Sequence, residues 1–408
     1  MNAPIVPVKI KGLCTSVNKF LNEVPRPYSV LTRLQQLIIP FIQTADEDTK
    51  VIPSGQGLTI PVSTPGSLRY SLEDPDLAPS RNGVTNGITD TNTPISHRTT
   101  LVEPHPSPSI TSLLNLSLPT TGTGPPGLTS LARLLLSYSV NTFSPGFLDK
   151  LYAATNAPGL AAELLLATLN TNLHVAHVSP ALTEVERTTS FALAKLVGWD
   201  RDAVDAEGNR PFRFAGGVAQ NGGSASNQLA MLIAKVTMFP ETKEGGNGAV
   251  PGGKRLVVLT SEHGHYSVEK ACVMAGLGSG AVRTVKVDER GRIIVEELEK
   301  EIAAAKERGE LPFFVNATAG TTVLGSFDPI GEIAKVARRE GLWCHVDGSW
   351  GGPVLFSEKL RKGRLDGIED VDSMAITPHK MLGVPVTCSF LVGRDLRLFK
   401  AASTLKAG

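Results

Sequence analysis

The second half of the chain alternates between short apolar runs and longer amphipathic stretches. Apolar runs typical of buried strands occupy residues 255–260, 281–287, 313–317, 343–346, 374–376 and 388–392. Between them, apolar side chains recur with helical spacing in residues 226–238, 267–275, 295–308 and 330–339. Continuous apolar strands separated by helices are typical of a mostly parallel sheet that is covered on both faces. The pattern therefore predicts an α/β fold from residue 214 onward.

The first half of the chain has a different pattern. Helical periodicity occurs over residues 13–42, 128–138, 160–169 and 183–197. Residues 53–108 are dense in Pro, Gly, Ser, Thr and Asn, and such a segment buries too little apolar surface to offset its chain entropy. We therefore expect three parts: a largely flexible N-terminal extension (1–110), a helical segment (111–213) and the α/β domain (214–408).

Composition narrows the possible partners. The 408 residues are 41% hydrophobic and carry a formal net charge of +1, which gives no reason to expect nucleic acid or an anionic membrane surface as partner. The cysteines lack the spacing of a disulfide framework or a zinc site, so no metal is expected: Cys14, Cys272, Cys344 and Cys388. No stretch is apolar enough to span a bilayer, and residues 1–7 lack the features of a secretory signal. We expect a cytoplasmic protein.

A histidine and a lysine, His379 and Lys380, stand on a short loop between two predicted strands. Loops at strand ends often carry functional residues, and ligands of parallel sheets bind beyond the carboxyl ends of the strands. A solvent-exposed lysine in a turn is the simpler interpretation of this stretch alone. The motifs upstream favour function, because each supplies one part of a single kind of site.

A loop rich in glycine and serine, residues 222–226, precedes the predicted helix at 226–238. Its backbone N–H groups, its hydroxyl groups and the positive end of the helix dipole are suited to hold a phosphate. A plain glycine turn with a serine N-cap explains the loop equally well. The loop is neither a Walker loop nor a GxGxxG fingerprint, so a nucleotide is not favoured.

Three further motifs follow strand ends. His265 lies where an imidazole can stack on a flat ligand, although a lone histidine is more often a helix cap or a partly buried residue. Residues 316–322 end a strand in small and hydroxyl side chains, which also suits a tight turn. Asp347 ends an apolar strand, where a carboxylate is costly unless it is paired. Its partner is either a protonated pyridine nitrogen or neighbouring backbone N–H groups.

Each motif is weak alone, but their order along the chain is specific. A phosphate loop, a stacking histidine, a threonine turn, a strand-end aspartate and a lysine are the parts needed to hold pyridoxal 5'-phosphate. Lys380 would form the imine with this cofactor, Asp347 would keep the ring nitrogen charged, and His265 would cover one face of the ring.

With these motifs in place, the sequence resembles the group II pyridoxal-phosphate decarboxylases, most closely the branch with glutamate decarboxylase and cysteine sulfinate decarboxylase. The resemblance runs from about residue 113 to residue 408 and is most specific over residues 316–330. Residues 261–271, 342–352 and 378–381 also fit the family. The resemblance implies the aspartate-aminotransferase-like fold, fold type I, and a homodimer with its sites at the subunit interface.

The resemblance also implies the roles of single residues. Lys380 matches the Schiff-base lysine, Asp347 the partner of the pyridine nitrogen, and His265 the residue stacked on the ring. These three are the expected catalytic residues. The other expected cofactor contacts are Ala225 and Ser226 in the phosphate loop, Thr321 near the cofactor, Ser349 on the ring, and His379 beside the lysine.

The sequence departs from the family at three places. Thr377 stands where the family usually has Asn, and Gly348 and Ser349 stand where it usually has two alanines. We expect the hydroxyl-bearing Ser349 to lie against the ring face opposite His265. The chain stops at Gly408, where the family continues for roughly a hundred residues, about one small domain. We expect this C-terminal small domain to be missing.

The resemblance implies decarboxylation of an L-amino acid of the glutamate, aspartate or cysteine sulfinate type to the amine and CO₂. Two alternatives remain open. The chain is a truncated, non-catalytic protein that binds pyridoxal phosphate, or it catalyses another reaction of the same fold, such as aminotransfer or aldol-type cleavage.

Overall fold

The computed structural model describes residues 27–48 and 107–404, apart from residues 115–116, 118–119, 145–146, 149 and 174. The chain divides into two compact units, Met1–Ala154 and Thr155–Gly408. The predicted flexible segment 53–108 lies outside the described residues, except for its last two positions. The predicted boundaries at residues 110 and 213 stay predictions.

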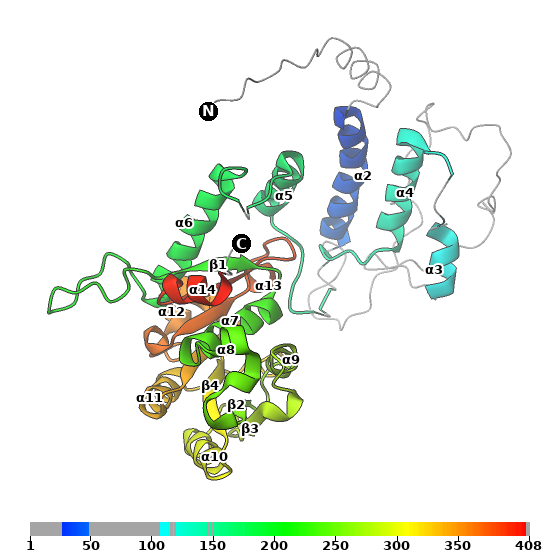
Figure 1. Cartoon of the computed structure of the whole chain (residues 1–408). Coiled ribbons are helices and arrows are strands. Elements are labelled where there is room, and N and C mark those ends of the chain that lie inside the picture. Colours follow the sequence, from blue (N-terminus) through cyan, green and yellow to red (C-terminus); the bar gives the residue numbers. More distant parts are fainter. Residues whose placement is uncertain are drawn as a thin grey trace, which may run out of the picture. The chain divides into compact units, whose positions relative to one another are not determined.

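The described part of the first unit is helical. It contains α2 (Pro27–Asp48), α3 (Ser107–Leu114) and α4 (Gly124–Tyr138), and α4 contacts the other two (Figure 1). The helix predicted at 128–138 is confirmed, but α4 begins a turn earlier. Pro125 and Pro126 occupy this first turn, where a missing N–H costs no hydrogen bond.

The second unit is built on a seven-stranded sheet in the order β1-β7-β6-β5-β4-β2-β3. The strands are β1 (Gly216–Gln220), β2 (Leu256–Ser261), β3 (Val282–Val285), β4 (Leu311–Thr318), β5 (Trp343–Gly348), β6 (Ser373–Ile376) and β7 (Ser389–Gly393). Strands β2 to β6 pair in parallel, and β7 is antiparallel to β6 and β1. The predicted, mostly parallel sheet is therefore confirmed, while β1 was not predicted because its Gly-Gly-Val-Ala-Gln sequence forms no apolar run.

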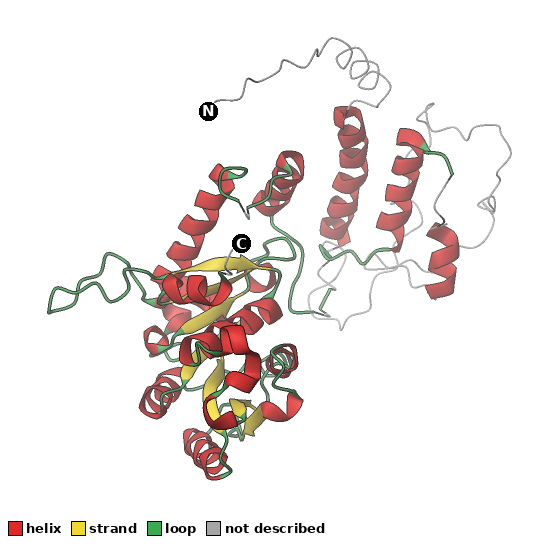
Figure 2. Ribbon diagram, in the orientation of Figure 1, coloured by secondary structure: helices red, strands yellow, loops and turns green. Residues whose placement is uncertain are grey.

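Helices alternate with these strands and lie on both sides of them (Figure 2). The longer ones are α5 (Ala157–Leu169), α6 (Pro180–Val197), α7 (Gly223–Met238), α9 (Ser267–Met274), α10 (Val295–Glu307), α11 (Ile330–Glu340) and α14 (Leu396–Ser403). All the helices predicted between the strands are present. None of the helices in the described residues is long and apolar enough to cross a membrane.

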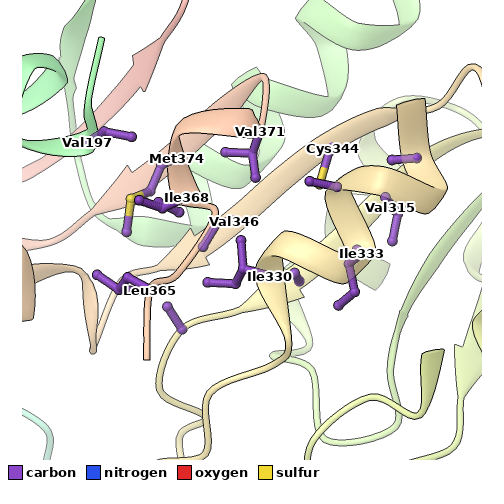
Figure 3. Packing of buried hydrophobic residues seen from close by; sticks show 14 of the residues in the cluster. Val197, Val315, Ile330, Ile333, Cys344, Val346, Leu365, Ile368, Val371 and Met374 are labelled. Carbon is purple, nitrogen blue, oxygen red and sulfur yellow. The ribbon is translucent and has the colours of Figure 1, made fainter. Parts of the chain in front are cut away.

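Two hydrophobic clusters lie on the opposite faces of the sheet. Successive side chains of a strand point to opposite faces, so neighbouring residues join different clusters. Phe314 and Trp343 belong to the cluster beneath α7 and α9, whereas Val315 and Cys344 belong to the cluster beneath α10 and α11. The second cluster is shown in Figure 3. This packing fixes the strands, and the loops at their carboxyl ends are thereby held at one edge of the sheet.

Candidate active site

A cavity of about 290 Å³ lies at the carboxyl ends of the parallel strands. Five of the predicted site residues line it: His265, Asp347, Ser349, His379 and Lys380. They come from the loops or ends that follow β2, β5 and β6. The structure therefore brings together side chains that are far apart in the sequence.

Lys380 lies in the short helix α13 (Pro378–Met381), directly after β6. Pro378 occupies the first turn of this helix and is buried, which fixes where the turn begins. Burial lowers the pKa of the Lys380 amine, and the Asp347 carboxylate acts in the opposite direction. An amine with a lowered pKa is more readily deprotonated and therefore more nucleophilic.

Asp347 lies near the end of β5 and is 4% exposed. Its Oδ2 accepts a hydrogen bond from Asn227 Nδ2 (2.8 Å), and its Oδ1 accepts one from the backbone N–H of Ser349 (3.0 Å). Burial alone would raise the pKa of this carboxyl, but interactions with Ser349 and Asn227 outweigh it and hold the pKa below its ordinary value. Asp347 is consequently ionised at neutral pH.

His265 lies between β2 and α9. The backbone N–H of Ser267 donates to His265 Nδ1 (3.2 Å), and the imidazole packs on the ring of Tyr266 at a centroid distance of 4.2 Å. Burial lowers the pKa of His265, Asp347 opposes this shift, and Lys380 adds to it. At neutral pH the ring is therefore uncharged, with Nδ1 as the hydrogen-bond acceptor.

The glycine-rich loop at the start of α7 forms another part of the wall, through Gly222, Gly223 and Ser224. A Cβ at position 223 would lie 2.0 Å from Ser349 Oγ, so only glycine fits between this hydroxyl and the helix. The N-terminus of α7 therefore approaches the strand ends with no intervening side chain at position 223. Its dipole and backbone N–H groups favour an anion there.

Two hydroxyl groups on the cavity wall are buried without a hydrogen-bond partner among the described residues. They are Ser349 Oγ and Thr318 Oγ1. The Ser349 hydroxyl lies close enough to the Asp347 carboxylate to help lower the pKa of Asp347. The two groups are nevertheless not oriented for a hydrogen bond. Buried hydroxyl groups are costly when unpaired, so their presence here indicates a site for a polar ligand.

Comparison with known proteins identifies the family. Residues 108–408 match the model described as the pyridoxal-dependent decarboxylase conserved domain. The chain belongs to this family.

Similar proteins from fungi support the assignment. The chain is 38% identical over 391 residues to an L-aspartate decarboxylase of Metarhizium robertsii, an alignment that covers 96% of this chain and 68% of that protein. It is 40% identical over 292 residues to a glutamate decarboxylase-like protein of Gibberella zeae, an alignment that covers 72% of this chain and 53% of that protein. The predicted resemblance to group II decarboxylases is thus confirmed.

Solved structures share the fold. Mouse CSAD is 38% identical, with a TM-score of 0.69 over 75% of this chain and 61% of that chain. Oryza sativa TDC with PLP and tryptamine is 26% identical, with a TM-score of 0.65 over 75% of this chain and 61% of that chain. The predicted fold type is confirmed. The chain spans from about half to two thirds of the length of these relatives.

The residues of this pyridoxal-dependent decarboxylase domain fit the family's cofactor, pyridoxal 5'-phosphate. The wall of the cavity holds an amine, an ionised carboxylate and an imidazole. It also holds unpaired hydroxyl groups and a glycine loop at a helix N-terminus. This donor set matches an aldehyde, a ring nitrogen, a flat ring and a phosphate.

Three of the predicted contacts do not form part of the cavity wall. Ser226 is buried, and its hydroxyl lies 3.0 Å from Ser389 Oγ. Ala225 follows Ser224 in the first turn of α7, where its N–H donates to Gly222 O (3.0 Å). The hydroxyl of Thr321 lies 2.8 Å from Ser326 Oγ. Their roles as cofactor contacts remain predictions.

Sequence reasoning missed Asn227, which holds Asp347. One signal was present: the residue lies in the second turn of an apolar helix, and a buried amide needs partners. His379, which was predicted, lies on the wall with its Nδ1 2.9 Å from the donating N–H of Cys388.

Proposed function

We propose that this chain catalyses the decarboxylation of an L-amino acid, of the aspartate, glutamate or cysteine sulfinate type, with pyridoxal phosphate as cofactor. The observation that carries the proposal is the convergence of Lys380, Asp347 and His265 on one cavity. An amine with a lowered pKa, a buried carboxylate and a neutral imidazole are what decarboxylation through this cofactor needs.

The chemistry divides between cofactor and protein. When bound, the cofactor supplies a conjugated ring that accepts the electron pair left behind as the carboxylate departs as CO₂. Lys380 would supply the amine that holds the cofactor. Asp347 would keep the ring nitrogen charged, and this charge would favour acceptance of the electron pair.

The protein must also return a proton to the substrate carbon. His265 Nδ1 accepts a hydrogen bond from Ser267 N–H, which leaves Nε2 as the atom of this ring that carries a proton. We assign the proton transfer to His265 Nε2, or to a water molecule held by it, within the described residues. The phosphate would lie against Gly222, Gly223 and Ser224, next to Ala225 and Ser226.

The acidic substrate class is supported by the relatives. The aligned fungal protein that covers 96% of this chain is an L-aspartate decarboxylase. The test is release of CO₂ from a panel of L-aspartate, L-glutamate, L-cysteine sulfinate and an aromatic L-amino acid. CO₂ and amine from one acidic substrate would support the proposal. A keto acid without CO₂ would indicate aminotransfer, and bound cofactor without turnover would indicate a non-catalytic protein.

The same panel should be run on the Metarhizium robertsii relative, which is 38% identical to this chain over 391 residues, as a positive control. Turnover by the relative with none by this chain would contradict the proposal.

We also propose that the chain forms a homodimer. Helix α5 has no buried residue, although most of its side chains are apolar, and Leu165 at its centre is 57% exposed. Exposed apolar surface of this kind marks a contact with another protein surface. The start of α5 is tied to the loop after Lys380: the N–H of Asn156 donates to Gly383 O (2.8 Å). A second copy over α5 would therefore border the active site.

A further inference from the structure

Alternate residues of β5 form a polar row beneath α7. Trp343, His345 and Asp347 lie at every second position of the strand, so their side chains point to the same face. Their exposed fractions are 7%, 0% and 4%. Ser373 on β6 is the register partner of His345. A buried imidazole two residues from the proposed cofactor carboxylate requires an explanation, because the proposed chemistry does not use it.

Hydrogen bonds join this row into one chain. Trp343 Nε1 donates to Ser373 Oγ (2.9 Å), and Ser373 Oγ lies 2.9 Å from His345 Nδ1. His345 Nε2 lies 3.0 Å from Asn227 Oδ1, and Asn227 Nδ2 donates to Asp347 Oδ2 (2.8 Å). This series of hydrogen bonds ends at the Asp347 carboxylate, which lines the cavity.

The donor and the acceptor of every hydrogen bond in this series follow from the residues at its two ends, Asp347 and Trp343. An ionised Asp347 only accepts, so Asn227 must turn its NH₂ group toward it. The second hydrogen of this NH₂ group is donated to Ser267 Oγ (2.9 Å). Asn227 Oδ1 is then an acceptor, and His345 Nε2 must carry the proton that it accepts.

The same directions follow from the Trp343 end of this series of hydrogen bonds. Indole Nε1 is only a donor, so Ser373 Oγ accepts from Trp343 and its own proton is free to reach His345 Nδ1. A neutral imidazole with its proton on Nε2 has the required lone pair on Nδ1. All the protons of the chain therefore point from Trp343 toward Asp347.

We infer that His345 is a positioning residue, held as the neutral Nε2–H tautomer, which acts through Asn227 to keep the Asp347 carboxylate ionised and aimed at the ring nitrogen of the cofactor. The inference rests on the proposed function for the identity of that ligand. Burial lowers the pKa of His345 to about 4, against the opposing effect of Asp347, which agrees with a neutral ring.

The test compares two cofactors in the apoprotein. 1-Deaza-pyridoxal phosphate has carbon in place of the ring nitrogen, so it lacks the interaction with Asp347. The ratio of its Kd to that of pyridoxal phosphate isolates the strength of this interaction. A role limited to packing would weaken both cofactors equally and leave the ratio unchanged.

Two variants of His345 form a matched pair. In His345→Gln the side-chain amide nitrogen can reach the position of imidazole Nε2 and donate to Asn227. In His345→Asn the amide reaches only the position of Nδ1. We expect the wild-type ratio in His345→Gln and a ratio about tenfold lower in His345→Asn, as for the loss of one hydrogen bond. An unchanged ratio in His345→Asn would overturn the inference.

A second measurement does not depend on the cofactor or on the variants. Nitrogen-15 NMR of the labelled wild-type apoprotein should show His345 with a protonated Nε2 and an unprotonated Nδ1 from pH 6 to pH 8. A protonated Nδ1 would overturn the inference. Failure of wild-type apoprotein to bind pyridoxal phosphate would instead contradict the proposed function. The NMR spectrum would still determine the tautomer of His345.

Discussion

Asp347 lies near the end of β5, and Lys380 follows the neighbouring strand β6. Both side chains line the same cavity, and the carboxylate acts on the pKa of the amine. In a parallel sheet the carboxyl ends of adjacent strands meet at one edge, so this geometry follows from the topology.

Lys380→Ala should abolish the visible absorbance of bound cofactor, because the variant lacks the amine that attaches it. The measurement is an absorbance spectrum of the purified protein after incubation with pyridoxal phosphate and desalting. Lys359→Ala, on the exposed helix α12 (Glu358–Arg361), is the matched control and should keep the band. Persistence of the band in Lys380→Ala would refute the assigned role.

Gly223→Ala should destabilise the cofactor-free protein. The new Cβ would lie 2.0 Å from Ser349 Oγ and 2.8 Å from Ser349 Cβ, and such overpacking costs about 1–3 kcal/mol. Adding Ser349→Gly should restore most of the loss in Tm, because it removes both contacts. Gly248→Ala, with no atom within 4 Å of its Cβ, should leave Tm unchanged. Additive effects of the two substitutions would show that the contact is absent.

Asp328→Asn should change how stability depends on pH. Asp328 accepts hydrogen bonds from Ile293 N (2.8 Å) and Thr318 N (2.7 Å), yet burial raises its pKa from 3.8 to about 6. A raised carboxyl pKa contributes stability that is present below pH 3.8 and is lost as pH rises through 6.

The wild type should therefore lose up to about 3 kcal/mol relative to Asp328→Asn between pH 4 and pH 7. Urea unfolding of both proteins at several pH values in this window measures the difference. Two parallel stability curves would mean that the pKa of Asp328 does not shift on folding.

Leu165→Glu should convert the proposed dimer into a monomer, since it places a charge in the exposed apolar surface of α5. Light scattering coupled to gel filtration gives the mass directly. Glu163→Gln, which changes a charged residue on the same helix without placing a charge on an apolar position, is the control. A monomeric wild type, or a dimeric Leu165→Glu at the same concentration, would count against the proposed contact.

Much of the fold could be predicted from the sequence, because β2 and β4 begin as apolar runs and helical periodicity separates the strands. The strand β1 could not, since pairing with β7 rather than its own composition makes Gly216–Gln220 a strand. The strand order also depends on contacts between distant segments, which no local pattern contains.

The site was predictable to a similar extent. Asp347 and Lys380 are visible in the sequence because charged residues at buried strand ends are unusual. Asn227 and His345 were not, because their importance arises only when β5 and α7 pack together. Local sequence therefore predicts the residues that face a ligand better than the residues that hydrogen-bond to them.

The hydrogen bond between Asn156 and Gly383 has a thermodynamic consequence. It connects the N-cap residue of α5 to the segment that follows Lys380, so ordering of one favours ordering of the other. If the association of two copies through α5 strengthens the binding of cofactor, the binding of cofactor strengthens that association by the same factor. The apparent cofactor affinity would then rise with protein concentration, and titrations at two concentrations a hundredfold apart would reveal the coupling.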